Sequence, residues 1–244
     1  MTDRSARWAL AADEVHVWQV SLDRPDSSVR RLAGLLSPDE GARAKRFVID
    51  RVRRRFVVCR GVLRLILGRY TGVAPGQLRF TYGAHGKPAL APGQGGEVCF
   101  NVSHSDGLAL YAVARGREIG VDVERLRPLP GAERIAERFF SIPEQAALQA
   151  LPAERKLEAF YTCWTRKEAY IKARGDGLGH PLDQFAVSIA PGEPARLSPA
   201  GDGDGREIAR WSLEGLPPAP GYVAALAGRG GGWRLASRQW PLRG

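Results

Sequence analysis

Two carboxylates at alternate positions of a short strand-like segment are the first residues with the pattern of a chemical site. Residues 119–124, IGVDVE, alternate so that Asp122 and Glu124 share one strand face and the apolar side chains share the other. Carboxylates this close repel unless a cation lies between them, and such oxygen ligands suit Mg²⁺ or Mn²⁺. The alternative is a solvated strand face without a chemical role.

A second group lies on one stripe of a predicted helix. At 100° per residue, Tyr161, Trp164, Glu168 and Lys172 fall within a sector roughly 60° wide. A surface Glu and Lys at this spacing usually form only a weak helix pair. Their alignment with two aromatic residues favours a cleft, in which Glu168 completes a three-carboxylate site and Lys172 meets an anion.

Residues 43–69 form the electropositive centre of the chain, with ten Arg or Lys residues against the single acid Asp50. Arg55 falls in angle with the apolar positions of this helix, so its guanidinium needs an anionic partner, either a structural acid or a ligand phosphate. The arginines that share another side of the helix are predicted to face solvent: Arg53, Arg60 and Arg64.

The tripeptide Ser103, His104, Ser105 lies between a predicted strand and a tight turn. It offers hydroxyls, a ring nitrogen and backbone amides, groups that often hold anions. Taken alone, His104 is more typical of a structural histidine.

Composition limits the class of protein. The 244 residues are 44% hydrophobic, enough for ordinary cores, and carry a formal charge of +10 that calls for an anionic partner. The apolar runs are short and the N-terminus lacks a signal-peptide pattern, so we expect a cytoplasmic protein. The three cysteines are far apart and are predicted to be reduced thiols.

The order of predicted elements indicates an α+β protein of two similar halves, residues 1–117 and 118–244. Each half is expected to place a small, mainly antiparallel sheet against a long helix. Strands are predicted at 15–21, 78–82, 98–102, 108–114, 119–124, 185–189, 207–213 and 222–227. Helices are predicted from Ser37 to about Gly68 with a break near Asp50, and at 132–139, 143–150 and 153–174. The tail after the glycine-rich tract 228–232 has no predicted element.

Five motifs follow one another along the chain: GKP at 86–88, FNVSHS at 100–105, IGVDVE at 119–124, RFFS at 138–141 and WTRKEAYIKARGDGL at 164–178. In this order they resemble the 4′-phosphopantetheinyl transferases of the surfactin-synthetase-activating (Sfp) type. GVDVE alone is a weak signal, but its combination with WTRKEAYIKA about forty residues later is highly specific. The similarity spans about residues 15 to 227.

The resemblance implies a monomer with pseudo-twofold-related halves, and coenzyme A and Mg²⁺ in the cleft between them. It also implies roles for residues of this chain. Asp122, Glu124 and Glu168 would hold the metal, and Lys172 would neutralise phosphate charge and assist proton transfer. The remaining coenzyme A contacts would come from Arg43, Arg55 and His104 at the 3′-phosphate, Ser103 near the phosphates, and Lys87 with Pro88 at the adenine. Glu40 departs from the pattern, because some members carry a lysine there for the 3′-phosphate.

The implied reaction transfers 4′-phosphopantetheine from coenzyme A to a serine of an apo acyl or peptidyl carrier protein and releases adenosine 3′,5′-bisphosphate. Glu168, directly or through a metal-bound water, is the candidate base, and Asp122 and Lys172 complete the catalytic group. No nucleic acid or membrane partner is expected. The competing interpretations are a nucleic-acid-binding module built on the basic segment and a coenzyme A binder or hydrolase.

Overall fold

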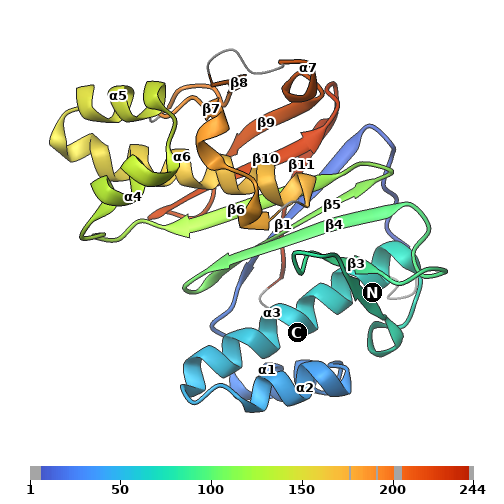
Figure 1. Cartoon of the computed structure of the whole chain (residues 1–244). Coiled ribbons are helices and arrows are strands. Elements are labelled where there is room, and N and C mark those ends of the chain that lie inside the picture. The colour runs from blue at the N-terminus through green and yellow to red at the C-terminus, as the bar shows by residue number, and fades with distance from the viewer. Residues whose placement is uncertain (1–6, 176, 191, 201–204, 242–244) are drawn as a thin grey trace.

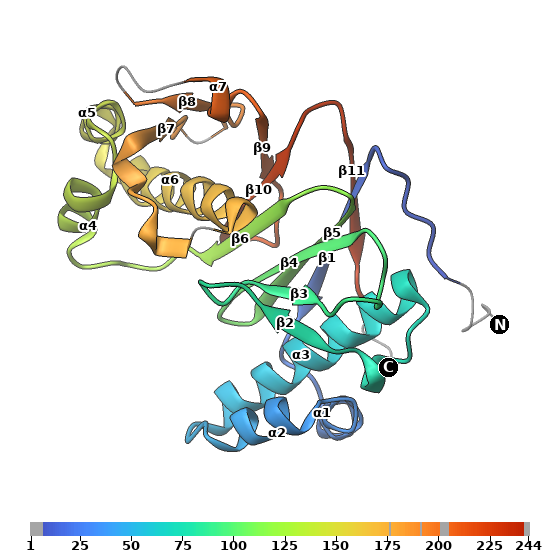
Figure 2. The same cartoon turned by 45° about the vertical axis from the view of Figure 1, so that its right-hand side comes forward.

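The protein has four layers, with two β-sheets face to face and a long helix on the outer face of each (Figures 1 and 2). The structure is a computed structural model that describes residues 7–175, 177–190, 192–200 and 205–241. This arrangement confirms the predicted α+β class.

The first half is a sheet covered by helices. The sheet order is β11-β1-β5-β4, with β11 parallel to β1 and the other pairs antiparallel. The strands of this half are β1 (Glu14–Ser21), β2 (Phe80–Tyr82), β3 (Pro88–Leu90), β4 (Val98–Ser105) and β5 (Leu108–Arg115). The helices are α1 (Asp26–Ala33), α2 (Pro38–Lys45) and α3 (Asp50–Thr71), and β2 pairs with β3 in a separate hairpin.

The second half repeats this plan with the sheet order β6-β10-β9, all antiparallel. Its strands are β6 (Ile119–Arg125), β7 (Phe185–Val187), β8 (Leu197–Pro199), β9 (Trp211–Leu216) and β10 (Tyr222–Arg229). Its helices are α4 (Ala132–Phe139), α5 (Ile142–Ala150), α6 (Ala153–Arg174) and α7 (Gly205–Ile208). Strands β7 and β8 form a small additional pair.

Side-chain alternation assigns each sheet face to a different core. Along β5, Tyr111 and Val113 face the core with α3, whereas Leu110 and Ala112 face the second sheet. The alternation of β6 sends Ile119, Val121 and Val123 into the same inter-sheet core. Asp122 and Glu124 therefore lie on the opposite face of β6, toward α6.

Gly120 determines how closely α6 approaches β6. A Cβ atom at this position would lie 2.2 Å from the carbonyl oxygen of Ala169 and 2.2 Å from the nitrogen of Ala173. Only glycine allows this backbone contact. The carboxylate face of β6 is thereby held against the helix that carries Glu168 and Lys172.

The two halves also meet edge to edge along β4 and β6. The backbone N–H of Val121 donates to Oδ1 of Asn101 at 2.9 Å. The ammonium of Lys87 donates to the carbonyl oxygens of Ile119 at 3.1 Å and Ala173 at 2.8 Å. The seam is therefore built from specific hydrogen bonds as well as from the apolar core.

The tail crosses back to the first half. β11 (Arg234–Gln239) pairs with β1, and Trp240 packs edge-on against Trp8 and Trp18. The sequence missed this strand, α1, β3 and β8. The strand predicted at 207–213 is wrong in its first half, because residues 205–208 form α7 and the strand begins at Trp211.

Across the described part of the chain, the helices fall short of the length and apolarity that a membrane span requires. Cys59 and Cys163 are buried free thiols, and Cys99 is half-buried.

Candidate active site

The carboxylates of β6 are hydrogen-bonded across the seam by serines of β4. The hydroxyl of Ser103 donates to Oδ1 of Asp122 at 2.7 Å, and the hydroxyl of Ser105 donates to Oε2 of Glu124 at 2.6 Å. These serines form the end of β4, one on each side of His104, so their side chains share the strand face toward β6. The first half of the chain thus positions the acids of the second half.

Helix α6 brings a cation to the same place. Nζ of Lys172 lies 2.5 Å from Oδ1 of Asp122 and 3.2 Å from the hydroxyl of Ser103. Asp122 is buried and Lys172 is half-buried. The sequence pattern predicted an anionic ligand as the partner of Lys172, and in this structure its ammonium is paired with Asp122.

Glu168, one turn before Lys172, belongs to the same electrostatic group. Burial raises the pKa of Glu168 to about 7, opposed by Lys172 and reinforced by the charges of Asp122 and Glu124. Burial also raises the pKa of Glu124. The charge of Asp122 raises it further, and the hydrogen bond from Ser105 partly opposes this rise. The negative charge of Asp122 thus disfavours ionisation of both Glu124 and Glu168.

One feature of this geometry argues against a preformed site for the predicted metal ion, and two features favour metal binding. Within the described ranges, no three His, Cys, Asp or Glu side chains converge as a ready metal site, and Lys172 neutralises Asp122 instead. Oδ2 of Asp122, however, is buried without a hydrogen-bond partner, and such an orphaned oxygen calls for a further ligand. The donor set is all oxygen and suits a hard divalent cation. Asp122, Glu124 and Glu168 therefore fit Mg²⁺ in chemistry, although they are not gathered around a preformed point.

His104 and Arg43 border this group. His104 is at the surface, yet partial desolvation and the charges of Lys172 and Arg43 lower its pKa. Arg43 is exposed on α2, with its guanidinium 5.4 Å from the ring centroid of Phe56. The exposed imidazole of His104 and the exposed guanidinium of Arg43 can therefore meet an anion beside Lys172.

Lys87 and Pro88 lie at the other end of the seam. The ammonium of Lys87 donates to the carbonyl oxygens of Ile119 in β6 and Ala173 in α6, and burial lowers the pKa of Lys87. Pro88 begins β3 and lines a cavity of about 670 Å³ with Lys87, Phe100 and Ile119. The side chain of Lys87 thus links the two halves of the chain and also lines a cavity large enough for a small-molecule ligand.

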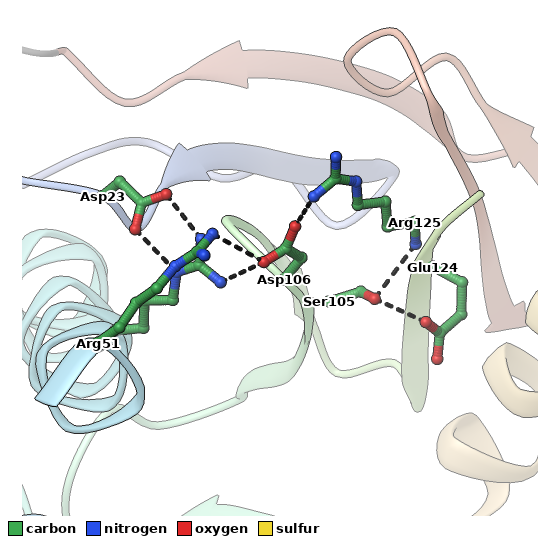
Figure 3. Close-up of polar contacts among 7 residues, drawn as sticks. Asp23, Arg51, Ser105, Asp106, Glu124 and Arg125 are labelled. Carbon is green, nitrogen blue, oxygen red and sulfur yellow. Dashed lines mark hydrogen bonds and ion pairs between the residues drawn. The ribbon is translucent and has the colours of Figure 1, made fainter. Parts of the chain in front are cut away.

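Arg55 is held by structural acids, one of the two alternatives that the sequence left open. Its guanidinium forms a bidentate pair with Asp23, at 2.8 and 2.7 Å, and a further pair with Asp106. Asp106 also pairs with Arg51 of α3 and with Arg125 of β6 (Figure 3). Sequence reasoning missed this cluster, since its members come from four separate segments of the chain. The only local signal was the turn after Ser105.

The prediction that Arg60 and Arg64 face solvent is wrong. Arg64 is 1% exposed and donates to Glu40 Oε2 at 2.6 Å, and Arg60 donates to Glu40 Oε1 at 2.8 Å. Arg53 is exposed as predicted, beside Asp50. Glu40, which departs from the resembled pattern, thus serves as the buried partner of two arginines.

Taken together, the fold and site define a two-half α+β protein with acids and cations concentrated along one seam, as suits an enzyme acting on a phosphorylated substrate. Family models match both halves: "4′-phosphopantetheinyl transferase, N-terminal" over residues 22–115 and "4′-phosphopantetheinyl transferase superfamily" over residues 118–227. The seam between β4 and β6 therefore joins the part of the chain that matches one family model to the part that matches the other.

Individual relatives agree. The 4′-phosphopantetheinyl transferase HetI of Nostoc sp. is 46% identical, with 92% of each chain covered. The transferase Sfp of Bacillus subtilis is 30% identical, covering 71% of this chain and 76% of Sfp. The solved holo-[acyl-carrier-protein] synthase of Thermotoga maritima is 22% identical with a TM-score of 0.35, covering 48% of this chain and 64% of that one. The chain belongs to the 4′-phosphopantetheinyl transferase superfamily, and it is a transferase enzyme of that family.

Proposed function

We propose that this enzyme transfers the 4′-phosphopantetheine group of coenzyme A to a serine hydroxyl of an apo acyl or peptidyl carrier protein, with Mg²⁺, and releases adenosine 3′,5′-bisphosphate. Mn²⁺ would be an acceptable substitute for Mg²⁺ by its similar ligand preference. We further propose that it acts as a cytoplasmic monomer and does not bind membranes or nucleic acid.

The observation that carries the proposal is the juxtaposition of Asp122 and Glu124 on β6 with Lys172 on α6, with one oxygen of Asp122 left unpaired. A diphosphate brings negative charge, which Lys172 can neutralise directly. Asp122, Glu124 and Glu168 would hold Mg²⁺, which when bound supplies charge neutralisation at the diphosphate. His104 and Arg43 lie beside these acids, and the cavity beside Pro88 lies at the other end of the seam; we assign both to the nucleotide part of coenzyme A.

The chemistry is a displacement at phosphorus. The serine oxygen attacks the β-phosphorus, a new P–O bond forms, and the bond from that phosphorus to the bridging oxygen breaks. The bisphosphate leaves with the electron pair, and Lys172 offsets its charge. Glu168 is the candidate base for the serine proton, directly or through a metal-bound water, because it is the carboxylate that α6 brings to this site.

The nucleic-acid alternative loses its main support in the structure. It needed a continuous basic face on α3, but Arg60 and Arg64 are turned to Glu40, and Arg55 is paired with Asp23 and Asp106. The cations that remain exposed lie at the start of α3 and on α2. Of these, Arg43 lies near His104 and Arg51 pairs with Asp106, both at the seam.

The test combines apo carrier proteins, coenzyme A and Mg²⁺, followed by intact mass spectrometry of the carrier and chromatography of the nucleotide. We expect a mass gain of one phosphopantetheine with stoichiometric adenosine 3′,5′-bisphosphate, and loss of both with EDTA. Bisphosphate release with phosphopantetheine left in solution would identify a hydrolase instead. Coenzyme A binding with neither product would identify a binder.

A further inference from the structure

Three aliphatic side chains project into solvent where α2 passes into α3. Val48 is 98% exposed, Ile49 65% and Val52 42%, and we call these three residues the apolar turn. The turn is well anchored, because the backbone N–H groups of Val52 and Arg53 both donate to the carbonyl oxygen of Ile49 at 3.0 Å. Grouped, rigid and exposed aliphatic residues are typical of an interaction surface.

The surroundings of the apolar turn are basic. Four exposed cations flank it against the single carboxylate Asp50: Lys45, Arg46, Arg51 and Arg53. Arg53 pairs with Asp50 and Arg51 pairs with Asp106, so the charge that these pairs do not neutralise comes from Lys45 and Arg46. A partner that complements this surface has an apolar stripe bordered by acidic side chains.

The apolar turn borders the candidate active site. Arg51, next to Val52, lies 3.2 Å from Oδ1 of Asp106, and the residue before Asp106 is the serine that holds Glu124 (Figure 3). The acceptor serine belongs to a macromolecule, and its hydroxyl must reach the diphosphate beside Asp122 and Glu124. The body of that macromolecule must therefore rest on surface next to this seam.

We propose that Val48, Ile49 and Val52, with Arg46 beside them, form a docking surface for the carrier protein, which contacts it through an acidic amphipathic segment. The proposal rests on the proposed function, because that function requires a protein as acceptor. The apolar turn supplies contact area, and the cations select and orient the acidic partner.

The experiment replaces Val48→Ser together with Ile49→Ser and measures transfer to an apo acyl carrier protein and an apo peptidyl carrier domain. We expect KM for the carrier to rise about tenfold with kcat within about twofold of wild type, as for loss of apolar contacts at an interface centre. Coenzyme A binding, measured by calorimetry, should not change. Leu235→Ser, which alters an exposed leucine of β11, is the matched control and should leave KM unchanged.

A second arm tests the charge. Arg46→Glu should raise KM at low salt and flatten its dependence on ionic strength. Binding of a carrier whose acceptor serine is replaced by alanine gives the same comparison without turnover.

The outcomes separate the two proposals. A wild-type enzyme that modifies no carrier overturns the proposed function and the docking surface with it. A wild-type enzyme that modifies carriers, with KM unaltered in the double variant, overturns the docking surface alone. Wild-type self-association that the double variant loses, with KM unaltered, overturns it in favour of a homodimer contact.

Discussion

Ser105 on β4 and Glu124 on β6 are joined by a hydrogen bond of 2.6 Å that crosses from one half of the chain to the other. The backbone N–H of Arg125 also donates to the hydroxyl of Ser105, at 3.2 Å. The next residue, Asp106, has φ of 49° and pairs with arginines from both halves. The turn that orients Glu124 is thus fixed by charges gathered from α3 and β6.

Asp106→Asn removes this charge and keeps the backbone, because asparagine tolerates the left-handed conformation. We expect the transfer rate to fall about tenfold, since looser presentation of Ser105 misplaces a carboxylate of the site. Stability should fall by only about 1 kcal/mol, because Arg51 and Arg125 are largely solvated and Arg55 keeps its bidentate pair with Asp23. Steady-state kinetics and thermal unfolding measure both. Asp50→Asn, an exposed acid at the start of α3, is the control, and equal rate losses in the two variants would contradict the role of Asp106.

The site residues that were predictable from sequence lie on elements with local patterns. Alternation on β6 identified Asp122 and Glu124, and helical spacing on α6 identified Glu168 and Lys172. The errors involve partners that are distant in sequence. The burial of Arg64 was not predictable from local spacing, because its partner Glu40 lies in another helix. Strand β11 was missed because its partner strand β1 is near the N-terminus.

Gly120→Ala should separate the two elements that carry the acids and the lysine. The new Cβ would meet backbone atoms of Ala169 and Ala173 at 2.2 Å, and backbone cannot move aside cheaply. We expect a loss of about 3 kcal/mol or more in unfolding free energy, at the upper end for overpacking. Differential scanning calorimetry measures the fall in Tm. Gly41→Ala in α2 is the control, because its Cβ meets nothing within 4 Å and the change should be neutral or stabilising. A Tm of Gly120→Ala equal to that of Gly41→Ala would contradict the close approach of α6.

Glu40→Gln should leave Arg60 and Arg64 without their buried counter-charge. We expect a loss of about 3–5 kcal/mol at neutral pH, the usual cost of breaking a buried pair from one side. Burial pushes the pKa of Glu40 upward, but the hydrogen bond from Arg64 and the charge of Arg60 outweigh it and hold the pKa below 4.5. A depressed pKa means that this stability is present above about pH 4.5 and is lost as pH falls through the pKa of the folded state. Denaturant unfolding between pH 3 and 7 should therefore show a smaller acid loss in Glu40→Gln than in wild type. Glu133→Gln, an exposed acid of α4, should reproduce the wild-type profile.

Glu168→Gln should lower the transfer activity measured with Mg²⁺. It should also change how the unfolding free energy of the metal-free protein depends on pH. Loss of the candidate base should lower kcat by about 100-fold or more, and the Mg²⁺ concentration for half-maximal activity should rise. Because the pKa of Glu168 is raised from 4.5 to about 7, the stability linked to its neutral form is complete below pH 4.5. That stability is lost as pH rises through 7, where a third negative charge forms beside Asp122 and Glu124. With EDTA present, the unfolding free energy of wild type should therefore decline between pH 4.5 and 7. The decline should be smaller in Glu168→Gln, in which only the raised pKa of Glu124 still contributes, and Mg²⁺ should restore the wild-type loss. Glu154→Gln, an exposed acid on the same helix, is the control; if Glu168→Gln kept the wild-type decline in EDTA, the three acids would not share one electrostatic site.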